Sequence, residues 1–448
     1  MSDFSSLLNQ VRNTIKNNGR VNLSGIDFNT WSFISFNFMN ELSDLNSPQA
    51  FIFGTEEEAE KAYTLILKYD KEALYYPPLS ENPYSSIIQS EASLYKRHLT
   101  LQKLIKKPKS TVVTTINAIQ LKVPTPTDVK NTFDITISDI ISPNDLAIKL
   151  TNMGFSSSPT VEEPGTFSKK GEIFDIYPLD QGPLRIHYFD DMIEEIFKID
   201  KDTLKTQKDN PVESIAINQS PQGIIDSNSI LNLRNNIPKF GLSSKSKTES
   251  RNIIFEKLSQ KMLFENYPLF FPLFFKETTT LLDYFSKDVL LNFFNFDQAS
   301  NDFSFFIEQI NEAYNQSIAD LEDDDIFPSP NLLFNEKLNF DNFKKICISE
   351  ISLSSDIDEE FESSIPIHFE PTKVFFKKFV HSEPKNKYEY LKKIIKLIEK
   401  KVASSGKLTV LYKNESSKKE LEYIISENIN NDFLKSNIKY INTPLASG

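Results

Sequence analysis

The sequence contains little glycine and almost no cysteine. Among 448 residues there are 11 glycines, and none lies between Gly241 and Gly406. Enzymes that bind nucleotides use glycine-rich turns in which backbone N–H groups approach the phosphates, and this chain offers few such turns. Cys347 is the only cysteine, which excludes an intrachain disulfide and a zinc site built from several cysteines.

Long apolar runs and an excess of positive charge are also missing. The most apolar stretch, 267–275 (YPLFFPLFF), contains two prolines and is far shorter than the ~20 apolar residues that a membrane-spanning helix needs. The first residues are polar and show no signal-peptide core. Lys and Arg number 50 against 62 Asp and Glu, a net charge of −12, which argues against a dedicated binder of duplex DNA. We expect a cytoplasmic protein with no membrane partner.

The chain is rich in phenylalanine, with 37 residues, and its apolar segments predict two kinds of sheet. Strand-like runs at 50–54 and 110–116 alternate with helical patterns after Thr55 and over 85–105, which predicts a parallel sheet with helices on both faces. After the linker 124–126, short strands joined by tight turns predict an antiparallel sheet. The predicted fold class is α/β: residues 1–124 and 218–343 form the two parts of a parallel-sheet domain, 125–217 an inserted small α+β domain, and 344–448 a further small α/β domain.

One segment has the spacing of a nucleotide-binding loop without its key residues. The phosphate loop has the pattern G-x-x-x-x-G-K-[ST], and here Gly25 and Ser32 occupy the first and last positions. Thr30 replaces the second glycine and Trp31, the only tryptophan, replaces the lysine. Tryptophan cannot neutralise a phosphate, so spacing alone favours an ordinary turn before a helix over a phosphate loop.

Other reactive residues lack the spacing that metal binding or catalysis needs. The four histidines are His98, His187, His368 and His381, and none forms a short ligand pair. We expect each on the surface or in a strand. The acidic run 322–325 lacks the glycine of a calcium loop, and Cys347 has no histidine nearby in sequence. No catalytic residue, metal or cofactor is expected.

The predicted strand 184–189 has two different faces, because side chains alternate along a strand. Leu184, Ile186 and Tyr188 share one face, whereas Arg185 and Phe189 share the other. If the aliphatic face is the core, Arg185 and Phe189 stand together toward solvent, and such pairs are typical hot spots of protein interfaces. The alternative is that Phe189 packs under a neighbouring domain and Arg185 is merely solvated. The residues alone leave both open.

The same region carries a family pattern. The segments are Val161–Pro178 (VEEPGTFSKKGEIFDIYP), Pro183–Asp191 (PLRIHYFDD) and Ile196–Asp200 (IFKID). They closely resemble the bacterial transcription-repair coupling factors (Mfd), which share this pattern with UvrB, the helicase-like component of the excinuclease. Gly19–Gly25 and Pro268–Ser286 are similar to flanking parts of the same family, so the resemblance extends over roughly 19–333.

Three departures from the UvrB pattern distinguish a resemblance to the coupling factors from a resemblance to UvrB itself. Thr30 and Trp31 break the phosphate loop, the gap from Tyr76 to Ser85 has no room for a DNA-clamping hairpin, and 292–297 (NFFNFD) lacks the acidic pair of the ATPase strand. All three match the coupling factors, whose N-terminal module is a degenerate helicase-like domain similar to UvrB. The resemblance implies an N-terminal fragment or a truncated chain that ends before the polymerase-binding and translocase domains.

The resemblance implies a non-catalytic adaptor of transcription-coupled nucleotide excision repair. Its inserted domain would recruit UvrA, the damage-recognition component of the excinuclease, through Lys170, Arg185 and Phe189, with a decayed ATP site and little DNA binding of its own. Lys170 stands where the family usually has arginine, and it keeps the charge but loses bidentate geometry. RNA polymerase and DNA are partners expected of the full-length family. The rival hypotheses are an ATP-dependent, UvrB-like or helicase-like repair protein and a stand-alone DNA-binding protein.

Overall fold

The computed structural model describes most of the chain up to residue 350 and shorter segments after it. The described residues are 4–28, 31, 47–80, 82–84, 91–129, 132–221, 227–236, 246–259, 267–320, 327–350, 364–366, 395–396, 399, 408–412, 415–428 and 438–442.

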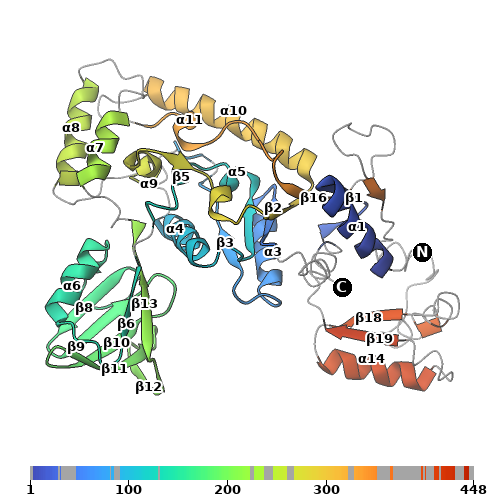
Figure 1. The fold of residues 1–448 in the computed structure, drawn as a ribbon, viewed down its shortest axis with the longest axis horizontal. Coiled ribbons are helices and arrows are strands. Elements are labelled where there is room, and N and C mark those ends of the chain that lie inside the picture. The colour runs from blue at the N-terminus through green and yellow to red at the C-terminus, as the bar shows by residue number, and fades with distance from the viewer. Residues whose placement is uncertain are drawn as a thin grey trace.

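The predicted parallel sheet is confirmed. Its described strands, in the spatial order β17-β1-β16-β15-β2-β4-β3, all pair in parallel. Their bounds are β1 Arg20–Ser24, β2 Gln49–Phe53, β3 Leu74–Tyr76, β4 Val112–Thr115, β15 Leu290–Phe294, β16 Lys344–Ser349 and β17 Ser364–Pro366. Because the order is not the chain order, the strands are joined by crossovers, and these carry the helices (Figure 1).

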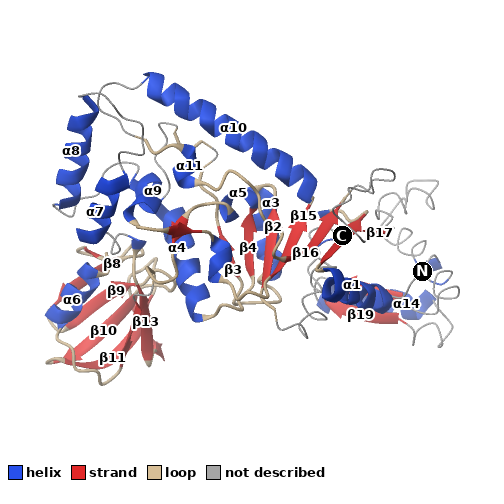
Figure 2. Cartoon of the chain, turned by 45° about the horizontal axis from the view of Figure 1, so that its top comes forward, coloured by secondary structure: helices blue, strands red, loops and turns tan. Residues whose placement is uncertain are grey.

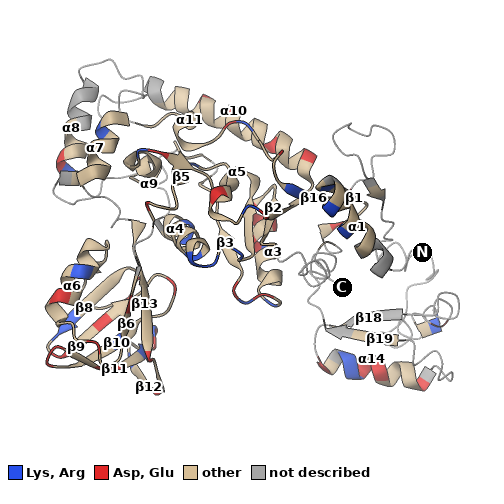
Figure 3. Cartoon of the chain, in the orientation of Figure 1, with Lys and Arg blue, Asp and Glu red and all other residues tan. Residues whose placement is uncertain are grey.

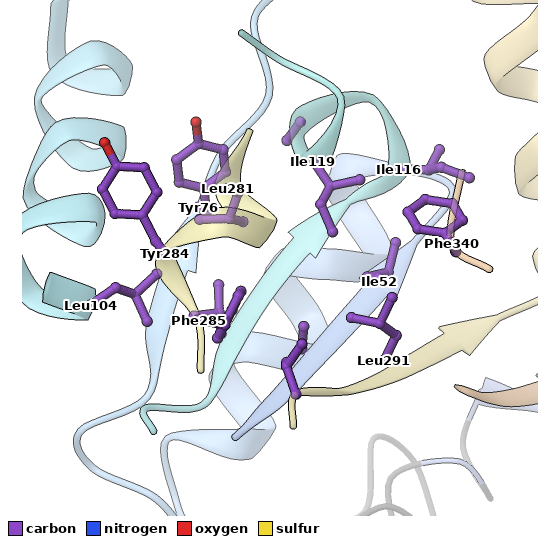
Figure 4. Close-up of a cluster of buried hydrophobic side chains, with 14 of the residues drawn as sticks. Ile52, Tyr76, Leu104, Ile116, Ile119, Leu281, Tyr284, Phe285, Leu291 and Phe340 are labelled. Atoms are coloured by element: carbon purple, nitrogen blue, oxygen red, sulfur yellow. The ribbon is translucent and has the colours of Figure 1, made fainter. Parts of the chain in front are cut away.

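Helices cover both faces of this sheet. One face packs on α1 (Phe4–Asn18) and α3 (Glu56–Ile66), and the other on α4 (Glu91–Lys106), α5 (Ile116–Ile119) and α10 (Phe296–Asp320). Along β2 the side chains alternate accordingly, with Phe51 and Phe53 in the first core and Ile52 in the second. Figure 4 shows this second core, to which α4 contributes Leu104 beside Phe285, and β2 and β15 contribute Ile52 and Leu291. α3 begins where predicted, because the Thr55 side chain accepts a hydrogen bond from the Glu58 N–H.

The apolar run 267–275 forms a buried layer within the parallel-sheet domain. It consists of α9 (Tyr267–Phe270) and η4 (Phe271–Phe274), and all of its residues are buried. Around it lie α7 (Ser227–Asn236), α8 (Ser246–Ser259) and α11 (Pro330–Leu333) (Figure 2). The short strand β5 (Val123–Pro124) also contacts η4 and pairs with β14 (Thr278–Thr279), whereas η5 (Leu281–Tyr284) packs in the second core. Among the described helices, none is both long enough and apolar enough to cross a membrane.

The inserted domain occupies 132–218, between β4 and β15. Its main sheet has the order β12-β11-β10-β9-β8-β7, and β13 pairs with β6 beside it. The bounds are β6 Thr132–Thr136, α6 Pro143–Asn152, β7 Ser156–Ser157, β8 Thr166–Lys170, β9 Ile173–Tyr177, β10 Leu184–Phe189, β11 Met192–Ile199, β12 Thr206–Pro211 and β13 Ser214–Asn218. β8 to β12 pair antiparallel, as predicted. In Figure 1 this domain lies as a separate body beside the parallel sheet.

The parallel sheet extends beyond residue 343, where a domain boundary was predicted. β16 begins at Lys344 and lies between β1 and β15, and β17 pairs with the other side of β1. These two strands therefore belong with the parallel sheet and not with the last unit. That unit contains β18 (Leu408–Tyr412), α14 (Glu415–Asn428) and β19 (Ile438–Asn442), and β18 pairs in parallel with β19.

His98 differs from its predicted place on the surface or in a strand, since it lies on α4 and is buried. Burial lowers the pKa of its ring to about 3. In the unfolded chain His98 takes up a proton near pH 6.5, whereas in the native chain it does not. The contribution of neutral His98 to the free energy of unfolding is therefore fully present above pH 6.5, and about 1.4 kcal/mol is lost for each pH unit below it. Urea unfolding at pH 7 and pH 5 should show a drop that is about 2 kcal/mol smaller in His98→Leu. If the wild type and His98→Leu lose the same stability between pH 7 and pH 5, this assignment is contradicted. As a control, the stability of each protein should not differ between pH 7 and pH 8.

Candidate docking face of the inserted domain

The sheet of the inserted domain has one buried and one open face, as the alternation in β10 predicts. Leu184, Ile186 and Tyr188 are buried and pack in one core with Leu146 and Leu150 of α6. The prediction that the aliphatic face of this strand forms the core is confirmed.

The three residues expected to bind a partner lie on the opposite face. Register places Arg185 across from Asp175 of β9, and Phe189 across from Met192 of β11. Lys170 of β8 lies across from Ile173, which is two residues from Asp175 and therefore shares its face. We call this surface the outer face; its members are Lys170, Ser168, Ile173, Asp175, Arg185, His187, Phe189, Met192, Glu195 and Phe197.

Arg185 does not stand free in solvent, in contrast to the expectation. Its Nε and Nη2 each donate a hydrogen bond of 2.7 Å to the two carboxylate oxygens of Asp175. Nη1 donates to the Thr206 hydroxyl at 3.0 Å. The hydrogen bond to Asp175 raises the pKa of Arg185. A fork-to-fork pair of this kind holds the guanidinium in one orientation, so Arg185 is a fixed part of the outer face.

Phe189 is exposed, and it continues into an apolar strip at the end of the sheet. Phe189 is 63% exposed, so within the described part of the chain no neighbouring domain packs over it, in contrast to the alternative. Met192 lies across from it and is 38% exposed, and Ile140, which is 83% exposed, forms a bridge with Met192. Apolar residues scattered singly on a surface are ordinary, whereas neighbouring exposed apolar residues make a candidate interaction site. Met192 and Ile140 were not predicted, because their place in this strip depends on which residues pair across the strands.

At the segment with the spacing of a nucleotide-binding loop, aromatic rings fill the carboxyl end of the parallel sheet. Gly25 follows β1 with a φ of 83°, a conformation that suits glycine. Trp31 is only 1% exposed; its ring lies 5.6 Å from that of Phe28 and 5.0 Å from that of Phe53. Thr30 and Ser32 lie outside the described residues. The position of the phosphate-binding lysine is thus part of a hydrophobic core.

The remaining candidates do not form a reactive site. Cys347 is buried on β16, and burial raises the pKa of its thiol to about 12, so the thiolate that reacts or binds metal does not form near neutral pH. Within the described part of the chain, no group of three or more His, Cys, Asp and Glu side chains is arranged to hold a metal ion. The acidic run 322–325, His368 and His381 lie outside that part.

Comparison with known proteins finds a family match over the inserted domain. Residues 133–218 match the family model of the UvrB interaction domain, a range that coincides with the inserted domain. The chain is similar to transcription-repair-coupling factors. The protein of that name from Staphylococcus haemolyticus (strain JCSC1435) is 28% identical over 251 residues, and that from Staphylococcus aureus (strain MRSA252) is 29% identical over 249. Each match covers 52% of this chain and 21% of the relative. The chain thus matches about a fifth of the length of these relatives.

Proposed function

We propose that this chain is a non-catalytic adaptor that recruits UvrA, the damage-recognition component of the excinuclease, through the outer face of its inserted domain. The observation that carries the proposal is an exposed Phe189 on the same sheet face as the cations Lys170 and Arg185, in a domain that matches the UvrB interaction domain. In a longer protein of this type, RNA polymerase and DNA would be further partners, and the protein would act in the cytoplasm.

The outer face offers a partner two kinds of contact. Phe189, Met192 and Ile140 form an apolar strip suited to a hydrophobic pocket on the partner. Lys170 is exposed and makes no ion pair within the described residues, so it is free to meet an acidic side chain. Arg185 stays hydrogen-bonded to Asp175, and the guanidinium N–H groups that these bonds do not use are available to a partner. An aromatic anchor beside an ordered arginine is typical of the few residues that carry most of an interface's binding free energy.

The test is a calorimetric titration of the chain with purified UvrA from the same organism. We expect the wild-type chain to form a saturable complex with UvrA. The heat of binding should largely disappear when Phe189 is replaced. Absence of any complex with active UvrA would overturn the proposal.

The same adaptor should neither bind nor hydrolyse ATP. The loop lacks a lysine, and Trp31 occupies a hydrophobic core where a phosphate would have to lie. Without the lysine and the close approach of backbone N–H groups, little opposes the cost of desolvating the phosphates. Calorimetry with magnesium and ATP should give no heat of binding, and micromolar binding would show that the site is intact.

Variants of Arg185 and Asp175 should distinguish an effect on UvrA binding from an effect on folding. Arg185→Ala leaves the Asp175 carboxylate nearly buried without its partner, which should cost about 1–3 kcal/mol of stability. The double variant Arg185→Ala/Asp175→Ala removes that unpaired charge, so its melting temperature should return most of the way to wild type. UvrA binding should stay weak in both variants. If the double variant binds like wild type, Arg185 acts only on the fold and is not part of the docking site.

A further inference from the structure

A pocket lined by lysines lies on the parallel-sheet domain, outside the docking face. It has a volume of about 480 Å³ and is formed by the start of β3, the side of α4 and Tyr63 of α3. Its charged lining residues are Lys71, Lys96, Lys103, Lys106, Lys107 and Glu72. Figure 3 shows the basic residues along α4. In a chain with a net charge of −12, this pocket is a local region of positive charge.

The lysines converge because α4 is amphipathic. Lys96 and Lys103 are seven residues apart on one side of α4, and Lys107 directly follows the helix, where its backbone N–H donates to the Lys103 carbonyl and keeps it on the same side. Leu101 and Leu104 lie on the other side and are buried against the sheet. At about 1.5 Å per residue, the stripe from Lys96 to Lys107 is roughly 16 Å long.

Acidic neighbours engage only part of this charge. Lys107 pairs with Glu72 at 2.7 Å, and Lys103 lies 3.6 Å from Asp180 of the inserted domain. Lys71 and Lys96 make no ion pair within the described residues. Glu56 lies near Lys96; burial raises the pKa of this carboxyl more than the lysine lowers it. Cations therefore remain in excess over acids in the pocket.

An aromatic pair adjoins these cations. The rings of Tyr63 and Tyr75 stack with centroids 5.3 Å apart and 27° between their planes. Tyr63 is half-buried, while Leu74 and Leu99 extend the apolar wall. A partly open ring beside a row of lysines is the arrangement with which proteins bind unpaired bases and their phosphates.

We propose that this pocket binds single-stranded nucleic acid, with one unpaired base against Tyr63 and the neighbouring phosphates along the lysines of α4. Its volume suits one nucleotide unit, and a base in a duplex cannot reach the ring because it is stacked and paired. The pocket includes neither Arg185 nor Phe189, so the proposal is independent of UvrA docking.

The test measures fluorescence anisotropy of a labelled oligothymidylate 12-mer with the whole chain at several salt concentrations. For contacts to five phosphates, affinity should fall up to about a hundredfold between 50 and 200 mM salt. Lys71→Glu/Lys96→Glu should weaken binding at least about tenfold and reduce the logarithmic salt slope by about 1.4, or about 0.7 per contact. The matched control, Lys276→Glu/Lys337→Glu, makes the same change in net charge at exposed lysines outside the pocket, and should bind like wild type.

Tyr63 tests stacking separately from charge. Tyr63→Phe should retain binding, whereas Tyr63→Ala should lose about five- to hundredfold in affinity, with melting curves to check that both are folded. The proposal is overturned if a duplex of the same length binds as tightly as the single strand, or if oligoglutamate of equal charge displaces the oligonucleotide equally well. A salt slope near zero for the wild-type chain overturns it without any variant.

Discussion

Replacing Phe189 with alanine is expected to weaken UvrA binding about thirty- to thousandfold, because a central aromatic anchor typically contributes ~2–4 kcal/mol. The side chain is largely exposed and contributes little to the core of the inserted domain. The melting temperature of Phe189→Ala should therefore equal that of the wild type. Calorimetric titration with UvrA and thermal unfolding measure the two effects on the same preparation.

Ile186→Ala is the matched control for this prediction, three residues earlier on the same strand and on its buried face. It removes buried methyl groups from a core, which should cost ~2–5 kcal/mol of stability. Lys170→Ala should weaken binding less than Phe189→Ala, since lysine offers a single hydrated charge. The docking proposal fails if Phe189→Ala binds UvrA like wild type. If it melts as early as Ile186→Ala does, the side chain has a structural role instead.

Replacing Trp31 with alanine should destabilise the parallel-sheet domain by about 3–5 kcal/mol, among the largest effects that a single substitution produces. The indole is buried and contacts the rings of Phe28, Phe51 and Phe53. Its removal leaves a cavity that strands fixed in a sheet cannot close. Urea unfolding followed by circular dichroism measures the loss.

Phe305→Ala is the control for Trp31→Ala, because it removes an aromatic ring that is largely exposed on α10 and should change stability by no more than about 0.5 kcal/mol. Trp31→Lys restores the residue that a phosphate loop requires, but it places an ammonium group in an apolar core. It should unfold the domain at least as strongly as Trp31→Ala and should not bind ATP. A folded Trp31→Lys chain that binds ATP would refute the view that the site has become part of the core.

The sequence predictions were correct where a feature depends on residues close together in the chain, and they were wrong where it depends on residues far apart. The helix after Thr55 and the alternation in β10 depend on neighbours within a few residues, and both were predicted correctly. The place of β16 was missed because its partner β1 lies more than 300 residues earlier in the chain. His98 was missed because α4 is covered on more than one side, so its helical pattern does not separate a buried from an exposed polar residue.

The sequence by itself determined the fold class, the broken phosphate loop and the strand that carries Arg185 and Phe189. Residue identity and local spacing are sufficient for these, because a missing lysine or an alternating strand needs no partner to be recognised. Only the tertiary structure decided that Arg185 is held by Asp175, that Met192 and Ile140 extend the strip of Phe189, and that lysines of α4 meet Tyr63. Each of these contacts joins different elements, and the register of strands and the packing of helices that bring them together are set by the whole core.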